Sequence, residues 1–176
     1  MRYIALLRGV TPTGKNRIPS MAALSGFLTE AGFRRVRTYI QSGNIILETG
    51  LSPREAAEAI HRVILNNIGA DLSVIMKTAG QLASAAEENP FTVSFDPDRV
   101  HLVFTNDEPD AEALRALTET EYEEERLAVG SKCIYMYLPR GARKKKLSTN
   151  YLERRLGITA TMRKLGVVRR LGKLGE

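Results

Sequence analysis

The segment "TYIQSGN", residues 38–44, gathers hydrogen-bonding side chains around one bend of the chain. The side chains concerned are those of Thr38, Gln41, Ser42 and Asn44. A hairpin accounts for the Gly and the Asn, because the apolar residues "IIL" follow at once, but it does not account for the other polar groups. Such groups either satisfy the backbone of turns and loops or hold a polar ligand. The sequence leaves both interpretations open.

A second motif, "GVTPTGKN" at residues 9–16, directly follows an apolar segment. It matches the phosphate-binding loop G-x-x-x-x-G-K-S/T except at its end, where Asn16 replaces the hydroxyl that would hold Mg²⁺. A phosphate loop also opens a helix near its Lys, whereas the next helix is expected only at about Met21. The sequence therefore argues against a nucleoside triphosphatase and favours a loop for a weaker anion, with Arg8, Lys15 and Arg17 as its cations.

Other residues that carry chemistry are few and scattered. His61, His101 and Cys133 lie on separate expected elements, so no metal site is predicted. No signature of nucleophilic or metal-dependent hydrolysis is present, and no cofactor is implied. These residues do not decide whether the protein is an enzyme.

The net charge of +6 conceals a strong asymmetry along the chain. Residues 130–176 hold 13 basic and 2 acidic side chains, whereas residues 107–125 hold 9 acidic and 1 basic. This pattern predicts either an anionic partner for the C-terminal part or contact between the two patches. Tyr135 and Tyr137 precede a basic cluster, a weak sign of a single-stranded nucleic-acid platform. The basic residues are Arg140, Arg143, Lys144, Lys145 and Lys146.

Nothing in the sequence indicates export or a membrane. No apolar run approaches the roughly 20 residues that span a bilayer, and the N-terminal segment has too few apolar residues for a signal peptide. The single cysteine cannot form an intrachain disulfide. We therefore expect a cytoplasmic protein with no membrane partner.

The hydrophobic periodicity predicts the order strand, helix, strand, strand, helix, strand, and predicts it twice. We expect a first half at 1–78, a linking helix and loop at 79–98, a second half at 99–162 and a basic tail at 163–176 with helical spacing. The second half is expected to include a helix over 109–117 and strands over 122–129 and 158–162. Such an order predicts an α+β fold of two packed ferredoxin-like halves.

Several segments occur in the order found in one known family, and these are "RYIALLRG", "GKN", "GFRRVRTYIQSGNIILE", "NPF", "IYMYLPRG" and "TMR". The chain resembles domain-of-unknown-function family 1697, a set of mostly bacterial proteins. The resemblance implies a duplicated ferredoxin-like fold and no established activity. It also marks Arg8-Gly9, Lys15-Asn16 and the bend at 41–44 as the distinctive residues.

The chain departs from the pattern of that family in two places. The family tends to have R-G-I-N-V-G-G-K-N, and here residues 11–13, "TPT", stiffen the loop. Near the C-terminus the family pattern resembles T-x-R-N-W-x-T-V. Thr161 and Arg163 are kept as a second candidate cluster, but Lys164 and Leu165 replace Asn and Trp. An activity that needs those replaced side chains would be lost or altered.

The topology brings the two N-terminal motifs together. The first and third strands of such a unit are adjacent and antiparallel, so we expect Asn44 close to Arg8, with Gly43 and Asn44 sharing the strain of the bend. The candidate ligand-binding residues are Arg8, Gly9, Lys15, Asn16, Thr38, Gln41, Ser42 and Asn44. Three functions remain open, namely binding of a small phosphate- or carboxylate-containing ligand, association with nucleic acid through the basic cluster, and self-association through complementary patches.

Overall fold

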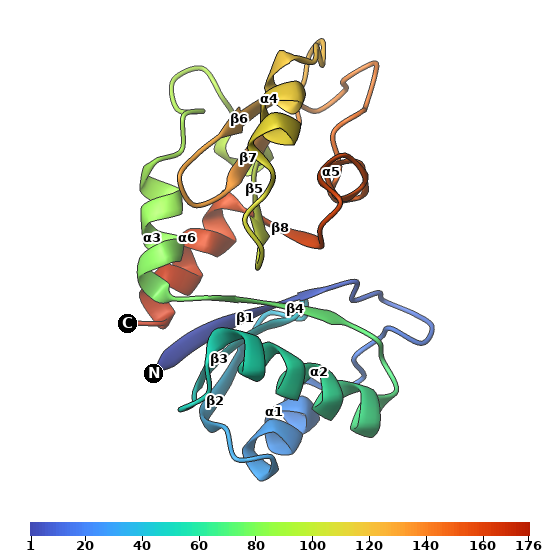
Figure 1. Cartoon of the computed structure of the whole chain (residues 1–176), viewed down its shortest axis with the longest axis vertical. Helices are drawn as coiled ribbons and strands as arrows, with labels where there is room; N and C mark the ends of the chain where they lie inside the picture. Colours follow the sequence, from blue (N-terminus) through green and yellow to red (C-terminus); the bar gives the residue numbers. More distant parts are fainter. The chain divides into compact units, whose positions relative to one another are not determined.

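The computed structural model describes all residues, 1–176, and divides them into two compact units (Figure 1). Unit 1 contains residues 1–79 and 173–176, and unit 2 contains residues 80–172. Each unit has a four-stranded antiparallel sheet with helices in the order β-α-β-β-α-β. The predicted duplicated ferredoxin-like α+β fold is therefore confirmed. None of the helices combines the length and the apolar character that crossing a membrane requires.

Unit 1 has the strand order β2-β3-β1-β4, with the apolar β1 in an interior position. Helices α1 and α2 cover one face of this sheet (Figure 1). The elements are β1 (Arg2–Arg8), α1 (Met21–Glu30), β2 (Arg34–Tyr39), β3 (Asn44–Glu48), α2 (Pro53–Ile68) and β4 (Ser73–Lys77).

Local chemistry fixes the helices of unit 1. The Ser20 hydroxyl accepts from the Ala23 amide at the start of α1. A reciprocal capping box between Ser52 and Glu55 begins α2. Gly69 ends α2 in the left-handed conformation. Ile60 and Ile64 of α2 belong to the same apolar core as Tyr3, Ala5 and Leu7, which share one face of β1. This single core joins the sheet to both helices.

Unit 2 has the strand order β6-β7-β5-β8. Its elements are α3 (Ala79–Glu87), the short 3₁₀ helix η1 (Pro97–Arg99), β5 (Val100–Thr105), α4 (Ala111–Glu119), β6 (Arg126–Val129), β7 (Ile134–Tyr137), α5 (Thr149–Leu156), β8 (Ala160–Lys164) and α6 (Leu165–Leu174). Helix α3 begins at the last residue of unit 1, and the last residues of α6 belong to unit 1. Helices α4 and α5 contribute Leu117, Tyr151 and Leu152 to a core with Val103 of β5. The predicted basic helix near the C-terminus is present as α6.

Three expected elements of unit 2 differ from the structure. The strand expected over 122–129 begins only at Arg126, because residues 122–125 form a turn in which Glu123 has a φ of +58°. Helix α4 begins two residues late because Asp110 accepts from the Ala113 amide and caps it. The last strand also begins two residues late, at Ala160, after the left-handed Gly157 ends α5.

Candidate functional site

The hairpin between β2 and β3 is closed by the side chain of Asn44. Asn44 is fully buried and lies opposite Leu6 of β1 and Tyr39 of β2. Its Nδ2 donates to the Tyr39 carbonyl at 3.0 Å and to the Ser42 hydroxyl at 3.0 Å. Both amide hydrogens are therefore committed to the hairpin, and Asn44 has an architectural role.

The backbone of this bend requires a glycine at position 43. Gly43 has a φ of +82°, and an added Cβ would lie 2.8 Å from Leu7 Cβ and 3.0 Å from Val10 Cγ2. The second residue with positive φ is Ile40, at +49°, and not Asn44 as we expected. Asn44 keeps its place in the β ladder because both neighbouring strands pair with it.

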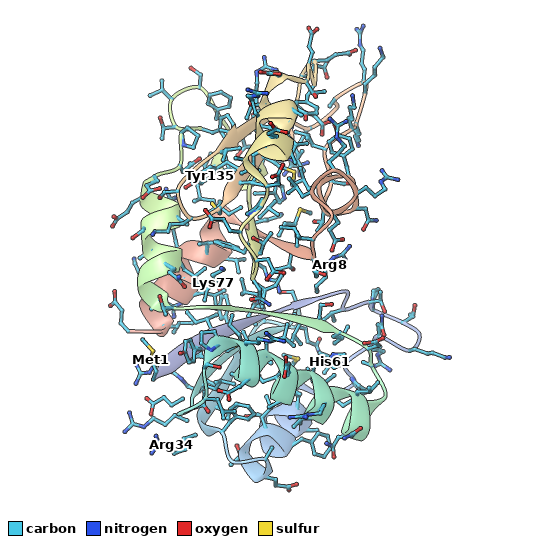
Figure 2. All side chains as sticks on the ribbon, viewed as in Figure 1. Met1, Arg8, Arg34, His61, Lys77 and Tyr135 are labelled. Atoms are coloured by element: carbon cyan, nitrogen blue, oxygen red, sulfur yellow. The ribbon has the colours of Figure 1, made fainter.

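The hairpin meets the end of β1, as the topology predicted. The Leu7 amide donates to the Gly43 carbonyl at 2.9 Å, and the half-buried Arg8 is the next residue (Figure 2). Gln41 lies exposed at the hairpin tip. Thr38 pairs with Ile45, which belongs to the helix-covered core, so Thr38 is on the opposite side of the sheet from Asn44. Gln41 therefore lies at the same end of the sheet as Arg8, whereas the side chain of Thr38 lies on the helix-covered face.

Residues 9–17, which we call the GKN loop, are closed on themselves. The Thr11 amide donates to the Asn16 carbonyl at 3.1 Å and the Arg17 amide to the Gly14 carbonyl at 3.3 Å. The Asn16 Oδ1 accepts from the backbone amide of Asp71 at 3.2 Å, which fastens the loop to the segment before β4. The predicted ligand residue Asn16 therefore also has an architectural role.

The two cationic side chains of the GKN loop do not take part in these hydrogen bonds. The side chains of Lys15 and Arg17 are exposed, and neither forms a hydrogen bond or an ion pair within the chain. The acid fastened to the loop, Asp71, has its carboxylate Oδ1 3.5 Å from Nε2 of His61 on α2. Neither of the two cationic side chains is thus paired with an acid, and both belong to a loop closed by its own hydrogen bonds.

The second candidate cluster, Thr161 and Arg163, lies on β8. The Arg163 Nη1 donates to the Thr161 hydroxyl and to the Met162 carbonyl, each at 2.8 Å. Burial lowers the pKa of the Arg163 guanidinium to about 10, so the group is still charged at neutral pH. The structure thus brings these two predicted residues together in a buried position.

The basic cluster of unit 2 meets the acidic segment of the same unit. The carboxylate of Glu125 is buried and accepts from the amides of Lys146 and Leu147 at 2.6 and 3.0 Å. Glu123 pairs with Lys144 Nζ at 2.8 Å. Glu124 accepts from the Arg143 amide at 3.0 Å. Contact between the two patches, one of the sequence-based expectations, therefore occurs within one chain.

The tyrosines beside the basic cluster are structural. Tyr135 is 1% exposed and donates its hydroxyl hydrogen to the Ala85 carbonyl of α3 at 2.5 Å. Tyr137 packs its ring against Phe95, with centroids 4.8 Å apart, and against Phe91. The ammonium of Lys146 lies over the ring of Tyr151. Of the two tyrosines of the predicted platform, Tyr135 is thus buried and Tyr137 is half-buried against phenylalanine rings.

The two units differ in net charge. Unit 1 has 11 basic and 6 acidic side chains, or +5, whereas unit 2 has 15 basic and 14 acidic, or +1. The basic C-terminal part of the sequence is thus nearly balanced by acids of its own unit. The excess positive charge belongs to the unit that carries the GKN loop.

Sequence reasoning missed His61 and Asp71 as neighbours of the GKN loop. Asn16 and Asp71 are 55 positions apart, and no spacing rule connects them. The available signal was the topology, because β4 lies beside β1 and places the start of one strand next to the end of the other.

These features define a class of protein with two ferredoxin-like units, of which the first has a cationic loop after its first strand. The chain matches the family described as "Protein of unknown function (DUF1697)" over residues 1–135, and it belongs to that family. It is similar to the conserved bacterial protein SP0830 from Streptococcus pneumoniae, with a TM-score of 0.69 and 23% identity over 99% of this chain and 98% of that one. At this identity the likeness shows the fold. No protein with a curated description matches the chain.

Proposed function

We propose that this protein binds a small phosphate- or carboxylate-containing ligand at the GKN loop. The observation that carries the proposal is the pair of exposed cations, Lys15 and Arg17, on a loop closed by its own hydrogen bonds. A loop fixed before binding loses less conformational entropy when the ligand arrives. A bound anion would supply the negative charge that compensates these two cations.

The surroundings of the loop support the same conclusion. Arg8 and Gly9 join β1 to the loop, and Gly9 has a φ of +96°, which only glycine adopts without strain. Gln41, at the tip of the adjoining hairpin, is exposed and has no hydrogen-bond partner in the chain. Guanidinium, ammonium and amide groups together suit a phosphate or carboxylate. We assign Lys15 and Arg17 to charge recognition, and Asn16 and Asn44 to holding the loop and the hairpin.

Nucleic-acid association has weaker support. The acids Glu123, Glu124 and Glu125 offset the basic cluster at residues 140–146, and unit 2 has a net charge of only +1. Tight binding to a phosphate backbone needs several uncompensated cations in a row. Within this cluster the ion pair is that of Lys144 with Glu123, whereas Glu124 and Glu125 bind backbone amides, and an oligonucleotide titration therefore belongs beside the anion titration.

The test is a titration with inorganic phosphate, sulfate and citrate, followed through the backbone amide resonances of the full chain. We expect the amides of residues 9–17 to shift and to saturate. Replacing Lys15 by Gln should weaken binding about threefold to tenfold, as expected for one exposed charged hydrogen bond. The matched control is Lys132→Gln, which removes an ammonium from unit 2 that is also exposed and unpaired. Absence of saturable shifts in residues 9–17, or equal effects of the two variants, would refute the proposal.

A further inference from the structure

The imidazole of His61 is held in a defined orientation on α2 (Figure 2). Its Nδ1 lies 2.8 Å from the Leu72 carbonyl oxygen, and because a carbonyl only accepts, Nδ1 must carry the hydrogen. The other nitrogen, Nε2, faces the Asp71 carboxylate at 3.5 Å. The proton that His61 gains or loses is therefore the one on Nε2, beside Asp71.

Asp71 connects this histidine to the GKN loop. Its carboxylate faces His61, and its backbone amide donates to the Asn16 Oδ1 at 3.2 Å. The protonation site at Nε2 is thus separated from the GKN loop by a single residue, Asp71. When Nε2 is protonated it donates to Asp71 and compensates the carboxylate. When it is not, Asp71 keeps an uncompensated negative charge next to the cationic loop.

The other charged groups around His61 do not share this position. On α2 itself, Glu58 pairs with Arg54 at 3.1 Å, and Arg62 is exposed. Helix α1, which packs on α2, has a single charged residue, Glu30 at its end, and β4 has only Lys77 at its far end. Lys15 and Arg17 flank Asn16, the loop residue that is hydrogen-bonded to Asp71.

We propose that protonation of His61 raises the affinity of the GKN loop for anions by compensating Asp71, an inference that rests on the proposed function. Histidine is the side chain whose charge ordinarily changes between about pH 5 and pH 8. The chain has only two histidines, and burial lowers the pKa of the other, His101 in unit 2, below its usual range. A change in anion affinity across this range therefore points to His61.

The first experiment measures sulfate affinity at about pH 5.5 and about pH 8, a range over which sulfate keeps its charge. The full chain should bind sulfate about twofold to fivefold more tightly at the lower pH, the size expected for one exposed ion pair. His61→Gln should abolish this ratio. Asp71→Asn should raise the affinity at the higher pH. Glu58→Gln removes an exposed acid of α2 that is not fastened to the loop, and it should leave both affinities unchanged.

The second experiment needs no ligand. In the free protein, the Asp71 amide and the Asn16 side-chain amide resonances should follow the titration of the His61 ring. Their pH dependence should disappear in His61→Gln. Unchanged Asp71 and Asn16 resonances across the titration, or a sulfate ratio that survives in His61→Gln, would overturn the inference. Absence of sulfate binding at both pH values would overturn the proposed function and the change in affinity with it, while the ligand-free titration decides the coupling of His61 to the loop separately.

Discussion

Gly43→Ala should destabilise the protein more than any other substitution that we predict here. Two effects add at this residue. A residue with a Cβ in the left-handed region costs about 1–2 kcal/mol, and Gly43 has a φ of +82°. The new Cβ would also lie 2.8 Å from Leu7 Cβ, which belongs to β1 and cannot move without moving the sheet. Overpacking of this kind costs about 1–3 kcal/mol. We therefore expect Gly43→Ala to lower the free energy of unfolding by about 2–5 kcal/mol.

The chain contains its own control for this substitution. Gly14, in the GKN loop, also has a φ of +82°, but an added Cβ there meets nothing within 4 Å. Gly14→Ala should therefore show the conformational effect alone, about 1–2 kcal/mol, and the effect of alanine on the unfolded chain is common to both variants. Urea denaturation followed by far-ultraviolet circular dichroism measures the difference. For a chain of this length each kcal/mol corresponds to roughly 2–4 °C in Tm. Equal destabilisation by the two substitutions would show that the contact with Leu7 carries no energy and would refute the argument.

Two further predictions concern polar groups of unit 1. Asn44→Ala should lower the free energy of unfolding by about 1–3 kcal/mol, because it removes a fully buried amide and leaves the part-buried Tyr39 carbonyl without its side-chain donor. Asn66→Ala, at an exposed position on α2, should change it little, and denaturation curves of the two variants decide this. The hydrogen bond from Arg2 lowers the pKa of Glu48 below its ordinary value of 4.5, so this carboxylate contributes stability above that pH and loses it as the pH falls through the lowered pKa. Glu48→Gln should therefore flatten the acid side of the stability profile, and an unchanged profile would contradict the assignment.

Much of the fold follows from local signals in the sequence. The capping box at Ser52 and Glu55, the Ser20 cap of α1 and the alternating apolar residues of the strands act within a few residues, and the structure has them where they were expected. The predicted bounds are wrong where a turn or a cap replaced part of the expected element. The turn at residues 122–125 shortened β6, because Glu125 turns inward to hold the amides of residues 146 and 147. No pattern near Glu125 indicates a partner 21 positions away.

The candidate site shows the same division between local and distant signals. The closeness of the hairpin to Arg8 followed from topology, because antiparallel pairing of β1 and β3 fixes which residues face each other. The role of each side chain did not follow from the topology, since the amide groups of Asn44 and Asn16 are equally suited to binding a ligand and to holding the backbone. Only the hydrogen bonds to Tyr39 and Asp71 show that these two amides hold the structure. What remains free for a ligand is the charge of Lys15 and Arg17.

The duplicated fold contains a further comparison that bears on the function. In unit 1 the connection from the first strand to the first helix, residues 9–20, contains the GKN loop with Lys15 and Arg17. The equivalent connection in unit 2, between β5 and α4, is residues 106–110, which are short and carry Asp107, Glu108 and Asp110. One topological position thus has opposite charge in the two units. A ferredoxin-like unit does not by itself require either charge, so the cations of the GKN loop are not a consequence of folding. Together with the net charge of +5 in unit 1, this difference supports the proposal that a ligand anion binds to the first unit and not to the second.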